Sequence, residues 1–302
     1  MNKEVKKTIS FLIILLASFA IVDWVFGKFA YNILIKMPQS SGEIAKMNYQ
    51  IEYSDYDCYI LGSSRAVHHY NPFIIKDSLR FSTYNAGCDG QGISYADGLL
   101  NAIIDRHLPK VVILECGQIE LANNWLEKMS TLKPYYKEHP KLLTIAMKIN
   151  GSTEKLKCIS SFYRFNSKFF QVLKAYALGS EDNSYGYEPF NSKVIEYLSY
   201  NKDTKEIYEL GDNAKSVLED FVKTCKRNNI RLVAFCSPVL YDYSEVSQNL
   251  NEVFKELDVP FYDYSNDTTF INHNELFGDF VHLNSEGADI YTKKIIKDLR
   301  NQ

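Results

Sequence analysis

Three polar residues of this chain have the types needed to activate a serine for attack on a carbonyl group. Ser64 follows an apolar run in the stretch ILGSSRA, and Asp279 and His282 stand three residues apart in GDFVHLNSEG. A serine hydroxyl is a weak nucleophile until a base accepts its proton. Histidine suits that role near neutral pH, and a carboxylate on its other ring nitrogen fixes the tautomer. These residues therefore predict acyl transfer through an acyl-serine.

The elements that would carry these residues alternate between strand and helix. Short apolar runs predict strands at residues 57–62, 82–87, 111–117, 231–238 and 260–264. Apolar residues recur at helical spacing at 93–107, 213–229 and 285–300. This alternation predicts a three-layer α/β/α sandwich around a parallel sheet of about five strands. Sites in such sheets collect at the carboxyl ends of the strands, which is where Ser64 stands.

Three sequence blocks resemble those of the SGNH, or GDSL-like, hydrolase superfamily. ILGSSRA is similar to the first block, NAGCDGQG to the second and DFVHLNSEGA to the final Asp-x-x-His block. The resemblance covers residues 55–302 apart from an insertion. It implies an SGNH-like fold, catalysis by Ser64, Asp279 and His282, and an oxyanion held by the N–H groups of Ser64 and Gly87.

The third block departs from the family pattern. Where the family has Gly-x-Asn-Asp, this chain has ECGQIEL, and Ile119 at the Asn position has no side-chain donor. Gln118 carries an amide and is the candidate replacement. Because losing one oxyanion donor costs on the order of 100-fold or more in rate, the chain is either a compensated enzyme, a slow one or a binding module.

Each of these residues also has a simpler structural interpretation. Ser64 is a good helix N-cap, and Gly87 suits a tight turn. Arg65 is placed to bind an anionic substrate, although a surface salt bridge is the more common role. His68 and His69 are expected on the helix after Ser64, pointing away from the site.

The composition is that of a folded globular chain, with 46% apolar residues, 24% charged residues and a net charge of −3. This charge gives no electrostatic basis for binding nucleic acid. No P-loop, dinucleotide motif or Cys/His spacing is present, so we expect neither cofactor nor metal. The six cysteines are expected to be mostly reduced and buried, with one disulfide left open.

The N-terminus predicts a membrane segment. Basic residues at 3, 6 and 7 precede Ile9–Phe26, a largely apolar stretch whose one charge is Asp23 and which is just long enough to span a bilayer. The basic residues favour a cytoplasmic N-terminus, which would leave the body of the protein outside. No small-x-small cleavage site follows the apolar run, so an uncleaved anchor is favoured over a secreted protein with a cleaved signal.

We therefore expect an anchor or signal segment at 1–27, a linker at 28–50 and an SGNH-like catalytic domain at 51–302. Residues from about 123 to 205 break the strand–helix rhythm and are expected as an insertion. This insertion would form a lid or side wall of a cleft, or a surface elaboration without contact to substrate.

The first block and the anchor together resemble membrane-anchored SGNH-like proteins that act on cell-surface polymers, including partners of teichoic acid D-alanylation and exopolysaccharide O-acetylation. This implies an ester hydrolase or acyl(acetyl)transferase for acylated cell-surface or extracellular glycans. Hydrolysis and transfer remain open at this point. Two alternatives are a catalytically weak glycan-binding module and an accessory partner of a membrane O-acyltransferase, with Asp23 as a docking feature.

Overall fold

The computed structural model describes residues 2–39, 42–117, 121, 129–180, 182–192, 211–241 and 243–300. These residues form two compact units. The first comprises Met1–Asn48 and Thr131–Glu181, and the second comprises Tyr49–Ser130 and Asp182–Gln302.

The second unit is built on a five-stranded sheet in the order β2-β1-β3-β4-β5, in which every neighbouring pair is parallel. The strands β1 to β5 are, in chain order, Cys58–Leu61, Thr83–Asn85, Val111–Glu115, Arg231–Cys236 and Phe261–Asp263. The three central strands are buried along nearly their whole length, as expected for strands covered on both faces. The predicted five-stranded parallel sheet is confirmed.

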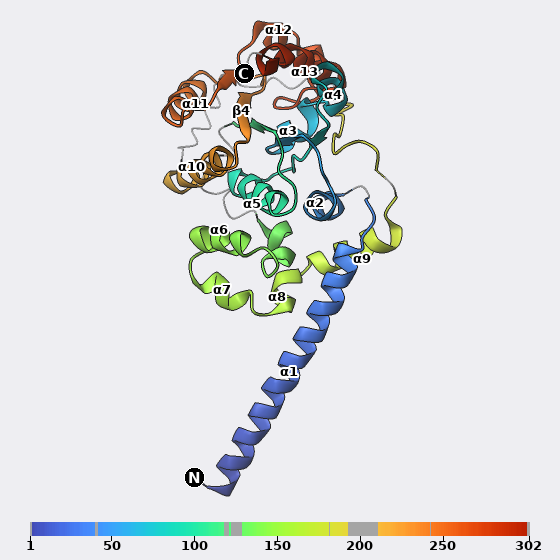
Figure 1. The fold of residues 1–302 in the computed structure, drawn as a ribbon, viewed down its shortest axis with the longest axis vertical. Coiled ribbons are helices and arrows are strands. Elements are labelled where there is room, and N and C mark those ends of the chain that lie inside the picture. The colour runs from blue at the N-terminus through green and yellow to red at the C-terminus, as the bar shows by residue number, and fades with distance from the viewer. Residues whose placement is uncertain are drawn as a thin grey trace. The chain divides into compact units, whose positions relative to one another are not determined.

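Helices cover both faces of this sheet (Figure 1). On one face, strand residues such as Ile60 and Ile113 share a hydrophobic core with Tyr70 and Tyr291. The helices of that face are α3 (Ser64–His69), α4 (Pro72–Leu79), α12 (Thr268–Ile271) and α13 (Ser285–Arg300). On the other face, α5 (Ile93–Ile104) and α10 (Asp212–Arg227) pack together, and α11 (Ser244–Glu256) contacts β5. The predicted three-layer sandwich is therefore confirmed.

The first unit is helical. It contains α1 (Lys3–Ile35), the start of α2 (Glu43–Glu52), most of the 3-10 helix η3 (Ser130–Tyr135), and α6 (Pro140–Asn150), α7 (Thr153–Lys157), α8 (Ser161–Phe165) and α9 (Lys168–Leu178). Helix α1 packs against α8 and α9. Among the described residues, α1 is the one helix long and apolar enough to cross a membrane, and a signal sequence meets the same criteria.

Two expected segments differ in local structure from their description above. Residues 28–50, expected as a linker, contain the last turns of α1 and most of α2. The expected insertion is divided, because residues 131–181 belong to the first unit, whereas 129–130 and 182–192 belong to the second. Its remaining parts at 123–128 and 193–205 lie outside the described residues.

Candidate active site

Ser64 stands at the carboxyl end of β1, directly after a tight backbone turn. Gly62 has a φ of +146°, and a Cβ there would lie 2.8 Å from the carbonyl oxygen of Glu115. A larger residue would therefore be both strained and blocked at this position. The turn brings Ser64 to the first position of α3, where it is partly buried at the edge of the sheet.

Ser64, His282 and Asp279 form one continuous chain of hydrogen bonds. The Oγ of Ser64 lies 2.7 Å from Nε2 of His282, across 218 residues of sequence. The Nδ1 of His282 lies 2.8 Å from Oδ2 of Asp279 and 3.0 Å from its Oδ1. With Nδ1–H donating to the carboxylate, Nε2 carries the lone pair that accepts the serine proton. The structure thus brings together the three residues singled out by the sequence.

A short turn holds Asp279 and His282 in register. Oδ1 of Asp279 accepts the N–H groups of Val281 and His282, each at 2.8 Å. The N–H of Gly278 donates to the carbonyl of His282 at 2.8 Å. Burial alone would raise the pKa of Asp279, but the hydrogen bonds from the His282 ring and from these N–H groups outweigh it and leave the pKa lowered. The carboxylate is thus ionised when it faces the imidazole.

Of the three expected oxyanion donors, the described residues include two, the N–H groups of Ser64 and Gly87. Among the described residues, none accepts a hydrogen bond from the Ser64 N–H. The N–H of Gly87, however, donates to Oδ1 of Asn85 at 3.1 Å. Gly87 lies so close to α3 that a Cβ would be 2.7 Å from the backbone nitrogen of Val67. Gln118, the expected third donor, lies outside the described residues.

A buried ionic network lies behind Ser64. Arg65, expected in a surface salt bridge, is instead 7% exposed and pairs with the fully buried Glu115 at 3.2 Å. Tyr70 donates its hydroxyl to the same carboxylate, and Ser237 donates its hydroxyl at 2.9 Å and its N–H at 3.2 Å. The expectation was wrong because Gly117 leaves space that the Arg65 guanidinium fills; a Cβ there would lie 1.6 Å from that group.

His69 extends this network to the loop that carries His282. Its Nδ1 lies 2.7 Å from the Ser237 hydroxyl, and its Nε2 accepts the N–H of Leu283 at 2.9 Å. Burial, followed by the nearby His282, Arg65 and His68, lowers the pKa of His69 well below its ordinary value. His69 is therefore a neutral imidazole with its proton on Nδ1.

Phe190 belongs to the expected insertion at about 123–205 and lies beside His282. The sequence predicts this insertion as a lid, a side wall of a cleft or a surface elaboration, but does not single out Phe190. The ring of Phe190 lies 5.4 Å from that of His282 and 5.2 Å from that of His68. The ring of His68 is itself 5.4 Å from His282, and its Nδ1 lies 2.6 Å from the carbonyl of Glu188. His68 was expected to point away. No local pattern marks Phe190, because its position depends on a segment more than 90 residues from His282 in sequence.

The six cysteines are buried and none of them is in a disulfide bond. Among the described residues, no group of three or more His, Cys, Asp or Glu side chains is arranged to hold a metal ion.

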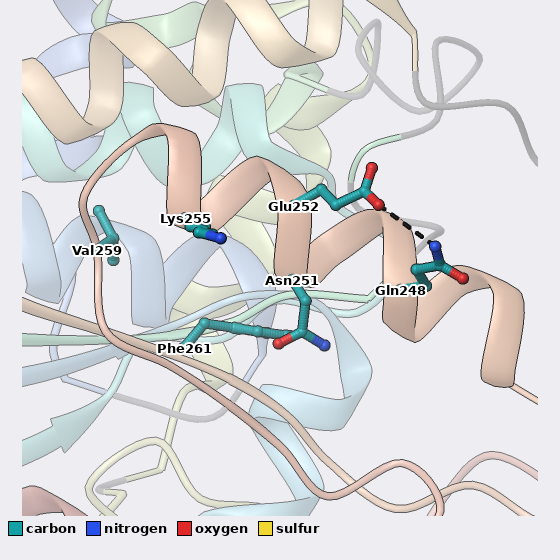
Figure 2. Close-up of a pocket in the computed structure, with 6 residues that line it drawn as sticks. All are labelled: Gln248, Asn251, Glu252, Lys255, Val259 and Phe261. Carbon is teal, nitrogen blue, oxygen red and sulfur yellow. Dashed lines mark hydrogen bonds between the residues drawn. The ribbon is translucent and has the colours of Figure 1, made fainter.

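A hollow of about 410 Å³ lies between α11 and β5, and none of Ser64, Asp279 and His282 lines it (Figure 2). Gln248 donates to Glu252 at 3.3 Å across its rim. Its lining holds no serine or histidine and consists of Gln248, Asn251, Glu252, Lys255, Val259 and Phe261. It therefore lacks the groups that acyl transfer needs.

Solved structures that align with this chain include the following two. One is a family two carbohydrate esterase from Clostridium thermocellum in complex with cellohexaose, with 9% identity and a TM-score of 0.42 over 83% of this chain and 66% of that chain. The other is a Bacteroides fragilis protein assigned as an acylhydrolase, with 12% identity and a TM-score of 0.40 over 84% of this chain and 93% of that chain. The chain thus spans just under two thirds of the esterase. No protein-family model and no curated protein matches it.

Proposed function

We propose that the chain is a serine-dependent ester hydrolase or acyltransferase of the SGNH type. The observation that carries this proposal is the chain of contacts from Ser64 through His282 to Asp279 at the carboxyl edge of a parallel sheet. If Ser64 were only a helix cap, its hydroxyl would need no hydrogen bond to an imidazole. If His282 were only structural, its ring would need no hydrogen bond to a serine. The combination is the arrangement that activates a nucleophile.

The first step forms an acyl-enzyme. Oγ of Ser64 bonds to the ester carbonyl carbon while its proton passes to Nε2 of His282. Asp279 stabilises the imidazolium that results. The N–H of Ser64 donates to the oxyanion, and the N–H of Gly87 would share its hydrogen between the oxyanion and Asn85. The bond to the alcohol then breaks, and His282 returns the proton to the leaving oxygen.

The second step decides between the two activities. His282 removes a proton from water or from a sugar hydroxyl, and the oxygen of that group bonds to the carbonyl carbon of acyl-Ser64. The bond from this carbon to Oγ of Ser64 then breaks, and His282 returns the proton to Oγ, which releases the free acid or the acylated sugar. The substrate class we propose is an acylated cell-surface or extracellular glycan. In this proposal α1 anchors the chain in the membrane and the catalytic unit lies outside the cytoplasm. The Phe190 ring beside His282 supports this substrate class, because a flat apolar surface suits a sugar ring or an acyl group.

A fluorophosphonate tests the proposal. The full chain is treated with the reagent in detergent, and the adduct is located by mass spectrometry, with Ser64→Ala and His282→Ala as controls. We expect one adduct per chain on Ser64, and none at that peptide in either variant. A folded protein that takes no adduct on Ser64 would overturn the proposal.

One observation favours the alternative of a catalytically weak glycan-binding module. The N–H of Gly87 already has Asn85 as its partner, so the oxyanion hole is not fully open. A chain of this kind would be retained on an acylated polysaccharide and take no adduct on Ser64. The second alternative, an accessory partner of a membrane O-acyltransferase, would show as co-purification of that protein with the full chain.

A further inference from the structure

Helix α1 consists of two parts with different surroundings. Its buried residues are Asp23, Gly27, Ala30 and Leu34, whose spacing places them on one face of the helix. Before Asp23 no residue of α1 is buried, and that part projects beyond α6–α9 (Figure 1). From Asp23 onward, one face of α1 is therefore part of the core of the first unit, whereas the part of α1 before Asp23 is exposed on all sides.

Asp23 fixes α8 against α1 at a definite level. Its carboxylate accepts the N–H groups of Ser161 and Phe162 at 2.8 and 3.0 Å and the hydroxyl of Ser160 at 2.7 Å. These groups lie at the N-terminal end of α8, so Asp23 acts as its cap from another helix. Gly27 one turn later has no room for a side chain, because a Cβ would lie 2.1 Å from Oγ of Ser161.

The length of the apolar segment places this junction at the bilayer. A helix needs about 20 apolar residues to cross about 30 Å of hydrocarbon. Counted from Thr8, just after the basic residues, such a stretch ends at Gly27, and Lys28 is the next charged residue. Asp23 does not interrupt it, because that carboxylate is buried and hydrogen-bonded. The bilayer would thus reach the level at which α8 is attached.

Large apolar side chains of α7, α8 and the start of α9 are exposed in the first unit. Phe162 of α8 stacks on Phe26 at 4.4 Å and lies 6.0 Å from Phe19, both on α1. Four large side chains near the attachment stand exposed by 40 to 75%, and we name them the membrane-facing cluster: Leu156, Ile159, Phe162 and Phe170. The exposed Lys155 and Lys157 flank Leu156 and suit anionic headgroups.

We propose that α7, α8 and the start of α9 dock on the lipid bilayer, and that the membrane-facing cluster inserts beside α1. Amphipathic helices that lie in the membrane interface bury their apolar face about 5–10 Å into the boundary between headgroups and acyl chains. The insertion then serves, over residues 153–170, as a platform on the membrane. This inference is independent of the proposed ester chemistry, since Ser64 has no part in it.

Lipid-borne quenchers test the docking. The full chain is reconstituted in vesicles of phosphatidylethanolamine and phosphatidylglycerol, and an NBD label is attached at Leu156→Cys, Ile159→Cys or, as an exposed control on α6 of the same unit, Thr144→Cys. Labelling is selective because the native cysteines are buried. We expect blue-shifted emission and loss of most fluorescence to doxyl-labelled lipid at 156 and 159, and neither change at 144.

Two results would overturn the proposal. One is labels at 156 and 159 that behave like the control, which would place the cluster in water. The other is a chain that fails to float with the vesicles, since α1 would then not be inserted. The vesicles contain no other protein, so quenching cannot come from a protein partner. A Ser64→Ala chain should give the same quenching, which separates this result from the outcome of the fluorophosphonate test.

Discussion

The Nε2 atom of His69 accepts the backbone N–H of Leu283 at 2.9 Å, which ties a fully buried imidazole to the residue after His282. The other ring nitrogen donates to Ser237, which in turn donates to Glu115. The loop that carries His282, the proposed base, is thus connected to a hydrogen-bond network that reaches the ends of β3 and β4. The hydrogen bonds of the His69 ring go to Ser237 and Leu283, so His69 acts on the site through its neighbours as a positioning residue.

The first prediction concerns the turnover that this contact supports. His69→Phe removes the acceptor for the Leu283 N–H while keeping a ring, so the His282 loop shifts. A displacement of about 1 Å can cost on the order of 100-fold in rate. We therefore expect kcat for a soluble acetyl ester such as p-nitrophenyl acetate to fall roughly 10- to 100-fold, with KM little changed.

His69→Gln is the matched control, because its side-chain oxygen can accept the same N–H. It should recover most of the lost kcat. Equal losses in the two variants would mean that ring packing, and not the hydrogen bond to Leu283, is what matters. An unchanged kcat in His69→Phe would remove the positioning role altogether.

The second prediction concerns stability against pH. The pKa of His69 is lowered by burial, so the native chain keeps this imidazole neutral below the unfolded value of about 6.5. In that range the unfolded chain binds one more proton at this position than the native chain. The free energy of unfolding should therefore fall as the pH drops below about 6.5, by up to about 1.4 kcal/mol per pH unit, until the native pKa is reached.

Urea unfolding between about pH 7 and pH 5 measures this slope. His69→Gln lacks the titrating group and should show a shallower slope than the unsubstituted chain. Parallel slopes would place the acid sensitivity of the fold elsewhere.

The third prediction concerns the buried ion pair. Glu115→Gln keeps the size of the side chain but leaves the buried guanidinium of Arg65 without its counter-charge. Breaking one partner of such a pair typically costs about 3–5 kcal/mol. We expect a loss of that size in chemical unfolding, and partial recovery in the double variant Arg65→Met/Glu115→Gln. A single-variant loss below about 1 kcal/mol would contradict a coupled pair.

The fold and the Ser64–His282 contact lie close to what the sequence predicts, and for a physical reason. The apolar runs at 57–62, 111–117 and 231–238 contain β1, β3 and β4, because strands buried on both faces leave a continuous hydrophobic signal. Parallel strands share one carboxyl edge, so residues after different strands meet there.

Other parts of the site have no such signal. The burial of Arg65 depends on the absence of a side chain at Gly117, and the position of Phe190 depends on a loop from the inserted segment. The hydrogen bond from the Gly87 N–H to the Asn85 side chain is likewise not predicted by any pattern in the sequence. Each of these contacts depends on distant segments or on side-chain orientations, and the local periodicity of apolar residues predicts neither.

The fourth prediction returns to Asp23, which the sequence suggested as a docking feature for another membrane protein. In the structure its carboxylate serves the N–H groups of Ser161 and Phe162 within the same chain. Loss of a helix cap costs about 0.5–2 kcal/mol. In Asp23→Ala, hydrogen exchange at the Ser161 and Phe162 amides of the detergent-solubilised chain should speed up, by roughly 5- to 30-fold for a loss of 1–2 kcal/mol.

Asp23→Asn keeps a side-chain oxygen as acceptor and should lie between the two, while Lys28→Gln on an exposed turn of α1 should leave exchange unchanged. Unaltered exchange in Asp23→Ala would mean that the cap does not hold α8. Hydrogen exchange is measured on this chain without any other protein, so faster exchange in Asp23→Ala reports a loss of stability within the chain. A role of Asp23 in binding another membrane protein would require a separate co-purification experiment.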